Sequence, residues 1–187
     1  MSNNLKIDLS KYDNSNYKPG RSFFICIFWY ITNILFFKSS IVWPIGFKCM
    51  LLRLFGARIG KNITIKPCVN VKYPWRLTIG NNVWIGENVW IDNLDDIIIQ
   101  DNVCISQGAL LLTGNHNYKK KTFDLITKSI KLEEGCWIGA KSVVCPGITC
   151  GTHSVLTVGS VATDSLESYY IYSGNPAIKI KKRILDE

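Results

Sequence analysis

From Ile59 onward, apolar side chains, most of them aliphatic, recur along this chain mainly in steps of six residues. Three groups of three such positions are separated by steps of eight, which gives a larger period of twenty. After one interruption the step of six returns and runs from Leu132 to Ala162. The repeat positions are all apolar: Ile59, Ile65, Val71, Ile79, Ile85, Ile91, Ile99, Ile105, Leu111, Leu132, Ile138, Val144, Cys150, Leu156 and Ala162. The period-two strands of a β-sandwich do not explain a fixed step of six.

A unit of six residues is too short to contain a helix, but it holds one short strand and one corner. Three units close a triangular coil of about 18 residues. Stacked coils form three parallel sheets whose strands lie ~4.8 Å apart. We therefore predict an all-β fold, a parallel β-helix, in which the aliphatic residues point inward and stack on their equivalents in the next coil.

Glycine and asparagine mark the predicted corners. Glycine often follows the repeat position, and pairs such as Asn81-Asn82 and Asp101-Asn102 lie between the strands. These residue types tolerate the left-handed backbone angles that tight corners need. The segments 73–77 and 93–97 each carry two extra residues, and we expect them to form bulges outside the prism.

Residues 1–58 lie outside the repeat and are apolar and basic. They contain eight Lys or Arg residues and two acidic residues, a net charge of +6. The mostly apolar stretch 22–37 is shorter than the ~20 residues that span a bilayer, so a packed or interfacial helix is favoured over a membrane span. No cleavable signal pattern precedes it. We expect a cytoplasmic protein whose residues 21–58 make peripheral contact with the anionic inner leaflet.

Composition narrows the class of protein further. Apolar residues make up 47% and charged residues 19% of the 187, which excludes a disordered chain. The net charge of +8 suits phosphate-rich small molecules or anionic lipid surfaces, whereas no recognition motif supports nucleic acid as a partner. The seven cysteines form no CxxC pair and are interpreted as small core residues in a reducing compartment.

The repeat is interrupted once, between Leu111 and Ile130, by a polar segment that contains His116, one of two histidines. A long loop that leaves a rigid coil is a common place for functional residues. A neutral imidazole there can accept a proton near pH 7, which makes His116 a candidate general base. The plainer alternative is a solvated loop histidine. A covalent cysteine route is disfavoured because no cysteine lies near His116 in the sequence.

The run IGNNVWIGENVWI at residues 79–91 resembles the hexapeptide-repeat acyltransferases. Within that family the chain is most similar to the branch assigned to colanic-acid and related exopolysaccharide biosynthesis. The strings that carry this likeness are LFGA at 54–57, DNVCISQG at 101–108, TGNH at 113–116 and SGNPA at 173–177. The resemblance covers residues 59–183. It implies a left-handed β-helix, a homotrimer with active sites between subunits, and direct acetyl transfer from acetyl-CoA without a metal.

The resemblance also implies which residues bind the substrates. The expected coenzyme contacts are Trp137, Gly139, Ala140, Val158, Gly159, Thr163, Pro176, Lys179 and Lys181. The expected acceptor contacts are Asp92, Asn93 and Asn115. Ile178 departs from the pattern, because sugar acetyltransferases of the family often have arginine there, and this leaves the phosphate contacts open. In the plainer alternatives Trp137 covers a coil face, the lysines are solvated, and Asp92 and Asn93 shape a corner.

We therefore predict an N-terminal helical segment over 1–58, a β-helix over 59–167 with a catalytic loop at 112–130, and a closing segment over 168–187. The expected activity is O-acetylation of a sugar or lipid-linked saccharide in surface polysaccharide biosynthesis. One alternative is a related acetyltransferase that acts on serine, an antibiotic or a nucleotide-linked amino sugar. The other is a non-enzymatic β-helix binding scaffold. A relative with carbonic anhydrase activity binds zinc with three histidines, and two are too few for that site.

Overall fold

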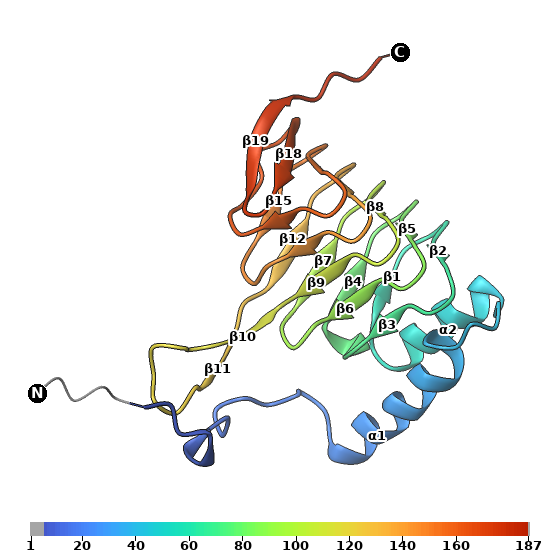
Figure 1. Ribbon diagram of the computed structural model, residues 1–187. Coiled ribbons are helices and arrows are strands. Elements are labelled where there is room, and N and C mark those ends of the chain that lie inside the picture. The colour runs from blue at the N-terminus through green and yellow to red at the C-terminus, as the bar shows by residue number, and fades with distance from the viewer. Residues whose placement is uncertain (1–5, 187) are drawn as a thin grey trace, which may run out of the picture.

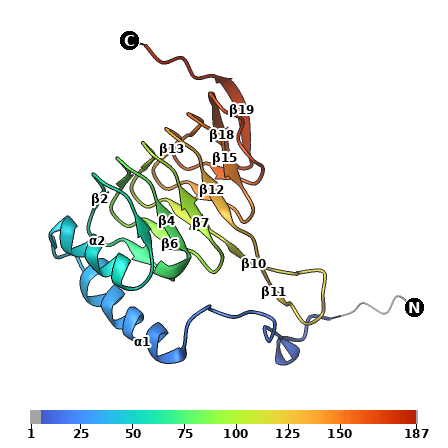
Figure 2. The ribbon, with the colours of Figure 1, turned by 180° about the vertical axis from the view of Figure 1, so that it is seen from behind.

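The computed structural model describes residues 6–186, and they form a tapering stack of coils (Figure 1). Two helices cover the first coils, and a hairpin covers the last. In between, a hairpin arm leaves one edge of the stack, which Figure 2 shows from behind. The predicted parallel β-helix with an N-terminal helical segment and a C-terminal closing segment is confirmed.

Three sheets form the sides of the prism, and we name them A, B and C. Sheet A contains β1 (Arg58–Ile59), β4 (Leu77–Ile79), β7 (Ile97–Ile99), β12 (Ile130–Leu132) and β15 (Thr149–Cys150). Sheet B contains β2 (Thr64–Ile65), β5 (Trp84–Ile85), β8 (Cys104–Ile105), β13 (Trp137–Ile138), β16 (Val155–Leu156), β18 (Tyr170–Gly174) and β19 (Ala177–Lys182). Sheet C contains β3 (Asn70–Val71), β6 (Trp90–Asp92), β9 (Leu110–Leu112), β14 (Val143–Val144) and β17 (Val161–Ala162). Strand pairs between coils are parallel, whereas β18 and β19 pair antiparallel.

The register of the sheets follows the sequence repeat. Ile59 lies opposite Ile79, and Ile79 lies opposite Ile99, so that residues twenty apart stack directly. Ile99 then lies opposite Leu132, which shows that the interruption leaves the register of sheet A intact. Every repeat position from Ile65 onward is buried. The core is thus a column of aliphatic side chains with hydrogen-bonded backbone on its three sides.

The corners follow a rule that the sequence showed only in part. The third residue after a repeat position has a positive φ at Asn62, Cys68, Asn82, Asn88, Asn102, Gly108, Gly135, Lys141, Gly147, His153 and Gly159. Asparagine and glycine accept this left-handed conformation at low cost, which explains their number there. Glycine directly after a repeat position occurs for a different reason, which is lack of space. A Cβ on Gly139 would lie 2.6 Å from the carbonyl oxygen of Leu156, so the next coil leaves no room for a side chain.

The helical segment packs on the first coils through α1 (Phe23–Thr32), the π-helical turn η2 (Asn33–Phe37) and α2 (Ile45–Leu54). The indole N–H of Trp29 donates to the carbonyl of Val71 at 2.9 Å. Lys48 is fully buried, and its ammonium group donates to the carbonyl of Lys66 at 3.1 Å. Within residues 6–186 no helix has the length and apolar character to cross a bilayer.

Residues 8–20 form an extended segment, here called the strap, that joins the arm to the helices (Figure 1). Its one regular element is the 3₁₀ turn η1 (Leu9–Lys11). The strap crosses the corner bulge that contains the 3₁₀ turn η3 (Pro74–Arg76), where the indole of Trp75 donates to the carbonyl of Pro19 at 2.7 Å. Next to it, the hydroxyl of Tyr17 donates to the carbonyl of Leu94 at 3.0 Å. The strap therefore covers the two corner bulges that the sequence predicted, and nothing in the repeat indicated it.

The inward and outward sides of sheet A allow a matched test of the core. Ile99 is 1% exposed and Ile98, its neighbour on β7, is 41% exposed. Ile99→Ala is expected to lower the free energy of unfolding by about 2–5 kcal/mol because it leaves a cavity between coils. Ile98→Ala is expected to change it by less than about 1 kcal/mol. Urea unfolding followed by circular dichroism measures both values, and equal losses would contradict the inward assignment.

Candidate functional site

The interruption of the repeat forms a hairpin arm, residues 113–129, that leaves the prism at the end of β9 (Figure 1). Its strands β10 (Gly114–His116) and β11 (Leu125–Thr127) pair antiparallel, with His116 opposite Leu125. Thr113 anchors the base of the arm. It is fully buried, and its hydroxyl donates to the carbonyl of Asp92 at 2.8 Å and accepts from the N–H of Asp95 at 3.0 Å. The arm thus rises from the corner where the two bulges lie in the coils below.

The orientation of the His116 ring is set within the arm. Its Nδ1 lies 3.0 Å from the carbonyl oxygen of Phe123, and the ring stacks on that of Phe123 at 4.5 Å with an interplanar angle of 8°. A carbonyl oxygen only accepts hydrogen bonds, so Nδ1 must carry the hydrogen. In the neutral imidazole this leaves Nε2 as the proton acceptor, which is the state that a general base needs.

Two residues that the sequence did not single out hold this ring. Phe123 has a φ of +52°, an uncommon conformation for an aromatic residue, and it directs its carbonyl toward His116. Tyr12 of the strap meets the His116 ring edge-on, with 5.7 Å between the ring centroids. The strap also binds the tip of the arm, since the N–H of Asp8 donates to the carbonyl of Lys121 at 3.0 Å. No sequence motif marks either aromatic residue, because their contacts arise from the path of the strap.

The expected acceptor residues differ in which of their polar side-chain atoms are still free to bind a ligand. Asp92 is 7% exposed, and its Oδ1 makes no hydrogen bond within residues 6–186 but lies 3.4 Å from the ammonium group of Lys72. Asn93 is fully buried, and its amide bonds to both the N–H and the carbonyl of Tyr73, one coil below. Asn115 is exposed and accepts from the N–H of His116 at 2.8 Å. The corner-shaping alternative therefore describes Asn93, whereas Asp92 and Asn115 have polar atoms near the base of the arm and beside His116.

Several expected coenzyme contacts meet at the corner between sheets B and C. Gly139 and Ala140 follow β13, and Val158 and Gly159 occupy the same corner one coil further along. The two coils are joined there, because the N–H of Gly159 donates to the carbonyl of Ala140 at 2.9 Å. Val158 is largely exposed. Trp137 stands beside this corner on sheet B and donates from its indole to the hydroxyl of Ser106 at 2.9 Å. We call this group of five residues the B–C corner.

The other expected coenzyme contacts lie apart from one another. Thr163 follows β17 at the edge of sheet C that faces sheet A, opposite the edge at the B–C corner. Pro176 forms the turn between β18 and β19. Lys179 pairs with Glu167 at 2.6 Å and lies 4.4 Å from the centre of the Tyr170 ring. Lys181 is exposed on β19. The charge of Lys179 is thus partly neutralised by its own chain, and Lys181 is the less engaged of the two lysines.

His116 and the B–C corner do not meet in one chain. The arm leaves the prism at the corner between sheets C and A, whereas Ala140 and Val158 lie at the corner between sheets B and C, on the opposite edge of sheet C. Burial raises the pKa of Cys136 well above its usual range and that of Cys150 to about 12, which disfavours a thiolate nucleophile at these two residues. No group of three potential metal ligands occurs within residues 6–186.

The relatives described below are all acetyltransferases by name, although no family model matches the chain. WcaF of Escherichia coli (strain K12), assigned as a colanic acid biosynthesis acetyltransferase, is 34% identical over 181 residues, which cover 96% of this chain and 99% of WcaF. The galactoside O-acetyltransferase of the same strain is 29% identical over 135 residues, 71% of this chain and 66% of that protein. The solved structure of the hexapeptide-repeat acetyltransferase VCA0836 from Vibrio cholerae, complexed with acetyl coenzyme A, matches with a TM-score of 0.70 and 23% identity over 76% of this chain and 80% of that one.

The contact between strap and arm predicts an effect on the opening of the arm. Tyr12→Ala removes an aromatic pair worth about 0.5–1.5 kcal/mol, so amide hydrogen exchange in residues 114–127 is expected to rise about 2–10-fold. Tyr118→Ala removes an exposed tyrosine from the same arm and is expected to leave the exchange unchanged. Mass spectrometry of peptic fragments measures both. Equal exchange in Tyr12→Ala and the unsubstituted protein would show that the contact of Tyr12 with His116 does not hold the arm.

Proposed function

Since the chain belongs to the hexapeptide-repeat acetyltransferases and is itself an acetyltransferase, we propose that it moves the acetyl group of acetyl-CoA to a hydroxyl of a sugar or lipid-linked saccharide in surface polysaccharide biosynthesis. The single observation that carries the chemistry is the imidazole of His116, whose Nδ1 is bound to the carbonyl of Phe123. The near-complete coverage of WcaF supports the polysaccharide context. The name of the galactoside O-acetyltransferase supports a sugar hydroxyl as the acceptor.

The proposed reaction is a direct transfer within a ternary complex. Nε2 of His116 accepts the hydroxyl proton while the hydroxyl oxygen attacks the thioester carbonyl. The carbon–sulfur bond then breaks, coenzyme A leaves as the thiolate, and the imidazolium returns the proton to that sulfur. The hydrogen bond from Nδ1 to Phe123 stabilises the imidazolium that forms in between. The raised pKa values of Cys136 and Cys150 disfavour a covalent acyl intermediate on either of these two residues.

The proposed active site lies between two copies of the chain. His116 stands on an arm that points away from its own coils, and the B–C corner is at the far end of sheet C (Figure 1). A neighbouring subunit of a closed ring can bring its B–C corner to this arm, as in a homotrimer with three equivalent sites. We propose that the B–C corner binds the pantetheine arm, with Thr163, Pro176, Lys179 and Lys181 toward the nucleotide. Asp92 and Asn115 contact the acceptor.

The proposed location is the cytoplasmic side of the membrane. Seven free cysteines fit a reducing compartment. The helical segment exposes apolar side chains of α1, among them Phe24 and Phe28, and segment 21–58 contains basic but no acidic residues. This combination favours peripheral binding to an anionic leaflet, where a lipid-linked acceptor is found.

The general-base role predicts a loss of turnover on substitution of His116. His116→Ala is expected to lower kcat by about 10²–10⁴-fold, since general base catalysis contributes that much. His153→Ala is the matched control, because the second histidine lies on a coil corner and should leave kcat unchanged. Release of free thiol from acetyl-CoA in the presence of a saccharide acceptor measures both. A loss below tenfold in His116→Ala would exclude the base assignment.

The acceptor class is tested with the unsubstituted enzyme. A panel of saccharides, serine, chloramphenicol and nucleotide-linked amino sugars is offered with acetyl-CoA, and the thiol release is compared. Among these acceptors, we expect only saccharides to raise thiol release above the background hydrolysis of acetyl-CoA. Turnover with serine only would defeat the sugar assignment.

A shared active site predicts recovery of activity in mixed oligomers. His116→Ala lacks the base and Val158→Glu places a charge on the B–C corner, so each variant alone is expected to be inactive. Refolding the two variants together in equal amounts should restore about a quarter of the wild-type activity, because mixed trimers contain one intact interface each. Activity assays after co-refolding, with sedimentation to confirm the trimer, measure this. No recovery in properly assembled mixtures would place both groups in one subunit.

A further inference from the structure

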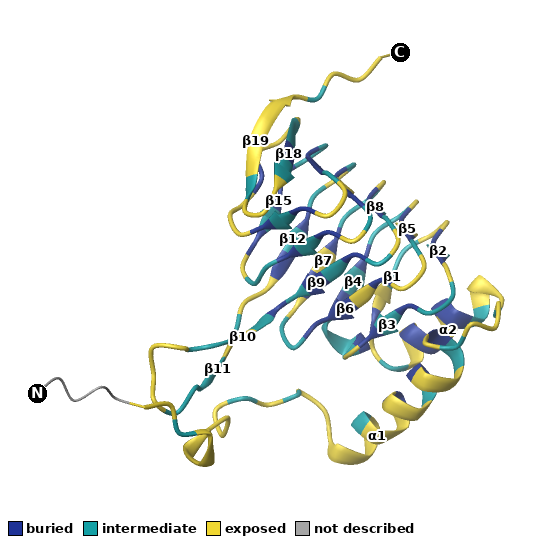
Figure 3. Ribbon diagram, viewed as in Figure 1, coloured by how far each residue is buried: buried dark blue, intermediate teal, exposed yellow. Residues whose placement is uncertain are grey.

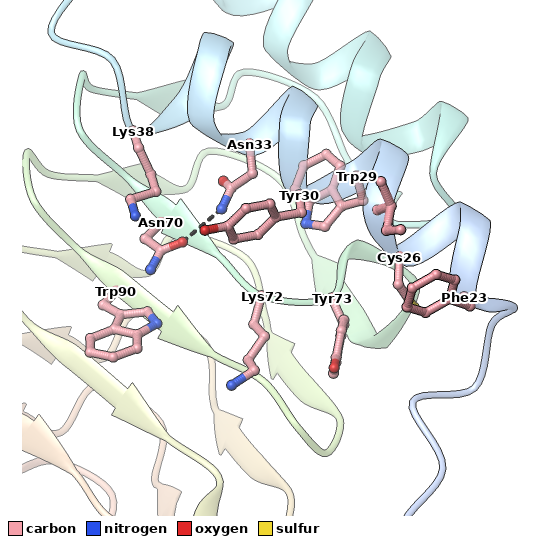
Figure 4. Close-up of a pocket in the computed structure, with 11 residues that line it drawn as sticks. Phe23, Cys26, Trp29, Tyr30, Asn33, Lys38, Asn70, Lys72, Tyr73 and Trp90 are labelled. Atoms are coloured by element: carbon pink, nitrogen blue, oxygen red, sulfur yellow. Dashed lines mark hydrogen bonds between the residues drawn. The ribbon is translucent and has the colours of Figure 1, made fainter.

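A cavity of about 350 Å³ lies between α1 and the outer face of sheet C (Figure 4). Its size is at the lower end of the range for small-molecule sites. Side chains from the helical segment and from the first two coils line it: Phe23, Cys26, Ile27, Trp29, Tyr30, Asn33, Lys38, Asn70, Lys72, Tyr73 and Trp90. None of the residues expected to bind acetyl-CoA is among them. The cavity is therefore a separate site from the B–C corner.

The walls of this cavity are mainly apolar and aromatic, and some of the polar groups in its lining bond to the protein. The amide of Asn33 donates to the amide oxygen of Asn70 at 2.7 Å, and the indole N–H of Trp29 donates to the carbonyl of Val71. The two charged groups of the lining are the ammonium groups of Lys38 and Lys72. In Figure 4 Lys38 and Trp90 lie toward one end of the cavity and Phe23 and Cys26 toward the other; Lys72 lies between them, with its ammonium group directed to the side of Trp90. The cavity thus has a cationic end and an apolar end.

The cationic end has more positive than negative charge. Within residues 6–186 no carboxylate pairs with Lys38, and segment 21–58 contains no acidic residue at all. Lys72 forms an ion pair with Asp92, with 3.4 Å between Nζ and Oδ1, so the two lysines share one carboxylate between them. Two ammonium groups beside an apolar wall favour an anionic group, and phosphate oxygens accept from lysine particularly well.

The apolar end continues onto the open face of α1. Phe23 is 73% exposed and lines the cavity, and the neighbouring Phe24 and Phe28 are 71% and 63% exposed. Figure 3 shows the outer side of α1 as exposed along most of its length. A run of large aromatic side chains in contact with water indicates a surface that binds something apolar. The cavity and this face together form one surface that is cationic at one end and hydrocarbon-like at the other.

We propose that this cavity binds a lipid phosphate, with Lys38 and Lys72 holding the phosphate and the aromatic face of α1 holding the first part of the hydrocarbon chain. The binding of the lipid does not depend on the proposed function. The further step, that the lipid carries the saccharide acceptor, rests on it. Trp90 lines the cavity and Asp92 lies two residues later on the same strand, β6. A sugar attached to the phosphate would extend along β6 toward Asp92 and Thr113, where the arm begins.

Calorimetry of the full-length protein with dodecyl phosphate, below its micellar concentration and without acetyl-CoA, tests the site. We expect binding of one molecule per chain, and at least tenfold weaker binding of both inorganic phosphate and the uncharged dodecyl maltoside. The double variant Lys38→Met/Lys72→Met keeps most of the side-chain length and removes both charges, and it is expected to weaken dodecyl phosphate binding at least tenfold. Lys61→Met, at an exposed corner outside the cavity, is the matched control and should bind as the unsubstituted protein does.

Several results would overturn the lipid site. Equal affinity for inorganic phosphate would indicate a free-anion site, and unchanged binding by the double lysine variant would remove the phosphate contacts. Dissociation of the oligomer on Phe24→Ser/Phe28→Ser substitution would show that the face of α1 contacts a second copy instead. The test is independent of turnover. Failure to bind dodecyl phosphate leaves acetyl transfer by the unsubstituted enzyme untouched, and absence of acetyl transfer leaves the binding result standing.

Discussion

The stacking of one coil directly on the next, through parallel backbone hydrogen bonds, is the constraint from which the rest of this structure follows. It brings residues twenty apart into register, as in the column Ile59, Ile79 and Ile99. It leaves no room for a side chain at Gly139, under the carbonyl of Leu156. It also requires a left-handed residue at each tight corner, which asparagine and glycine supply at low cost. A single spacing between coils thus sets the core, the corners and the register.

This rigid prism determines where functional groups are found. Residues on the coils have fixed positions, so the B–C corner is a preformed edge with Ala140 and Val158 in adjacent coils. The arm is different, because a hairpin outside the prism has few neighbours of its own. Phe123 orients the His116 ring from within the arm, and Tyr12 of the strap supports it from outside. N-terminal residues of the chain therefore help to fix the His116 ring, the proposed general base, at a position that the coils themselves do not reach.

The helical segment has two surfaces with different physical characters. Its inner side packs into the core of the first coils, where Trp29, Phe37 and Leu52 are buried. Its outer side exposes aromatic residues to water, and between the helix and sheet C a cavity remains that is bordered by two lysines. The inner side serves stability, because the open end of a β-helix otherwise exposes its aliphatic column. The outer side has no such purpose within one chain, and this is why we assign it a ligand.

The sequence by itself determined the repeat, the inward residues, the two corner bulges and the one interruption that contains His116, because each depends on local spacing along the chain. It also identified the family through short strings, and the similarity to WcaF agrees with that identification. Only the tertiary structure decided which partners the side chains have. It buried Asn93 against Tyr73, paired Lys179 with Glu167, and brought Tyr12 to His116 across about a hundred residues of chain. Such contacts depend on how the strap, the arm and the closing hairpin cross the prism, and a six-residue period contains no information on those paths.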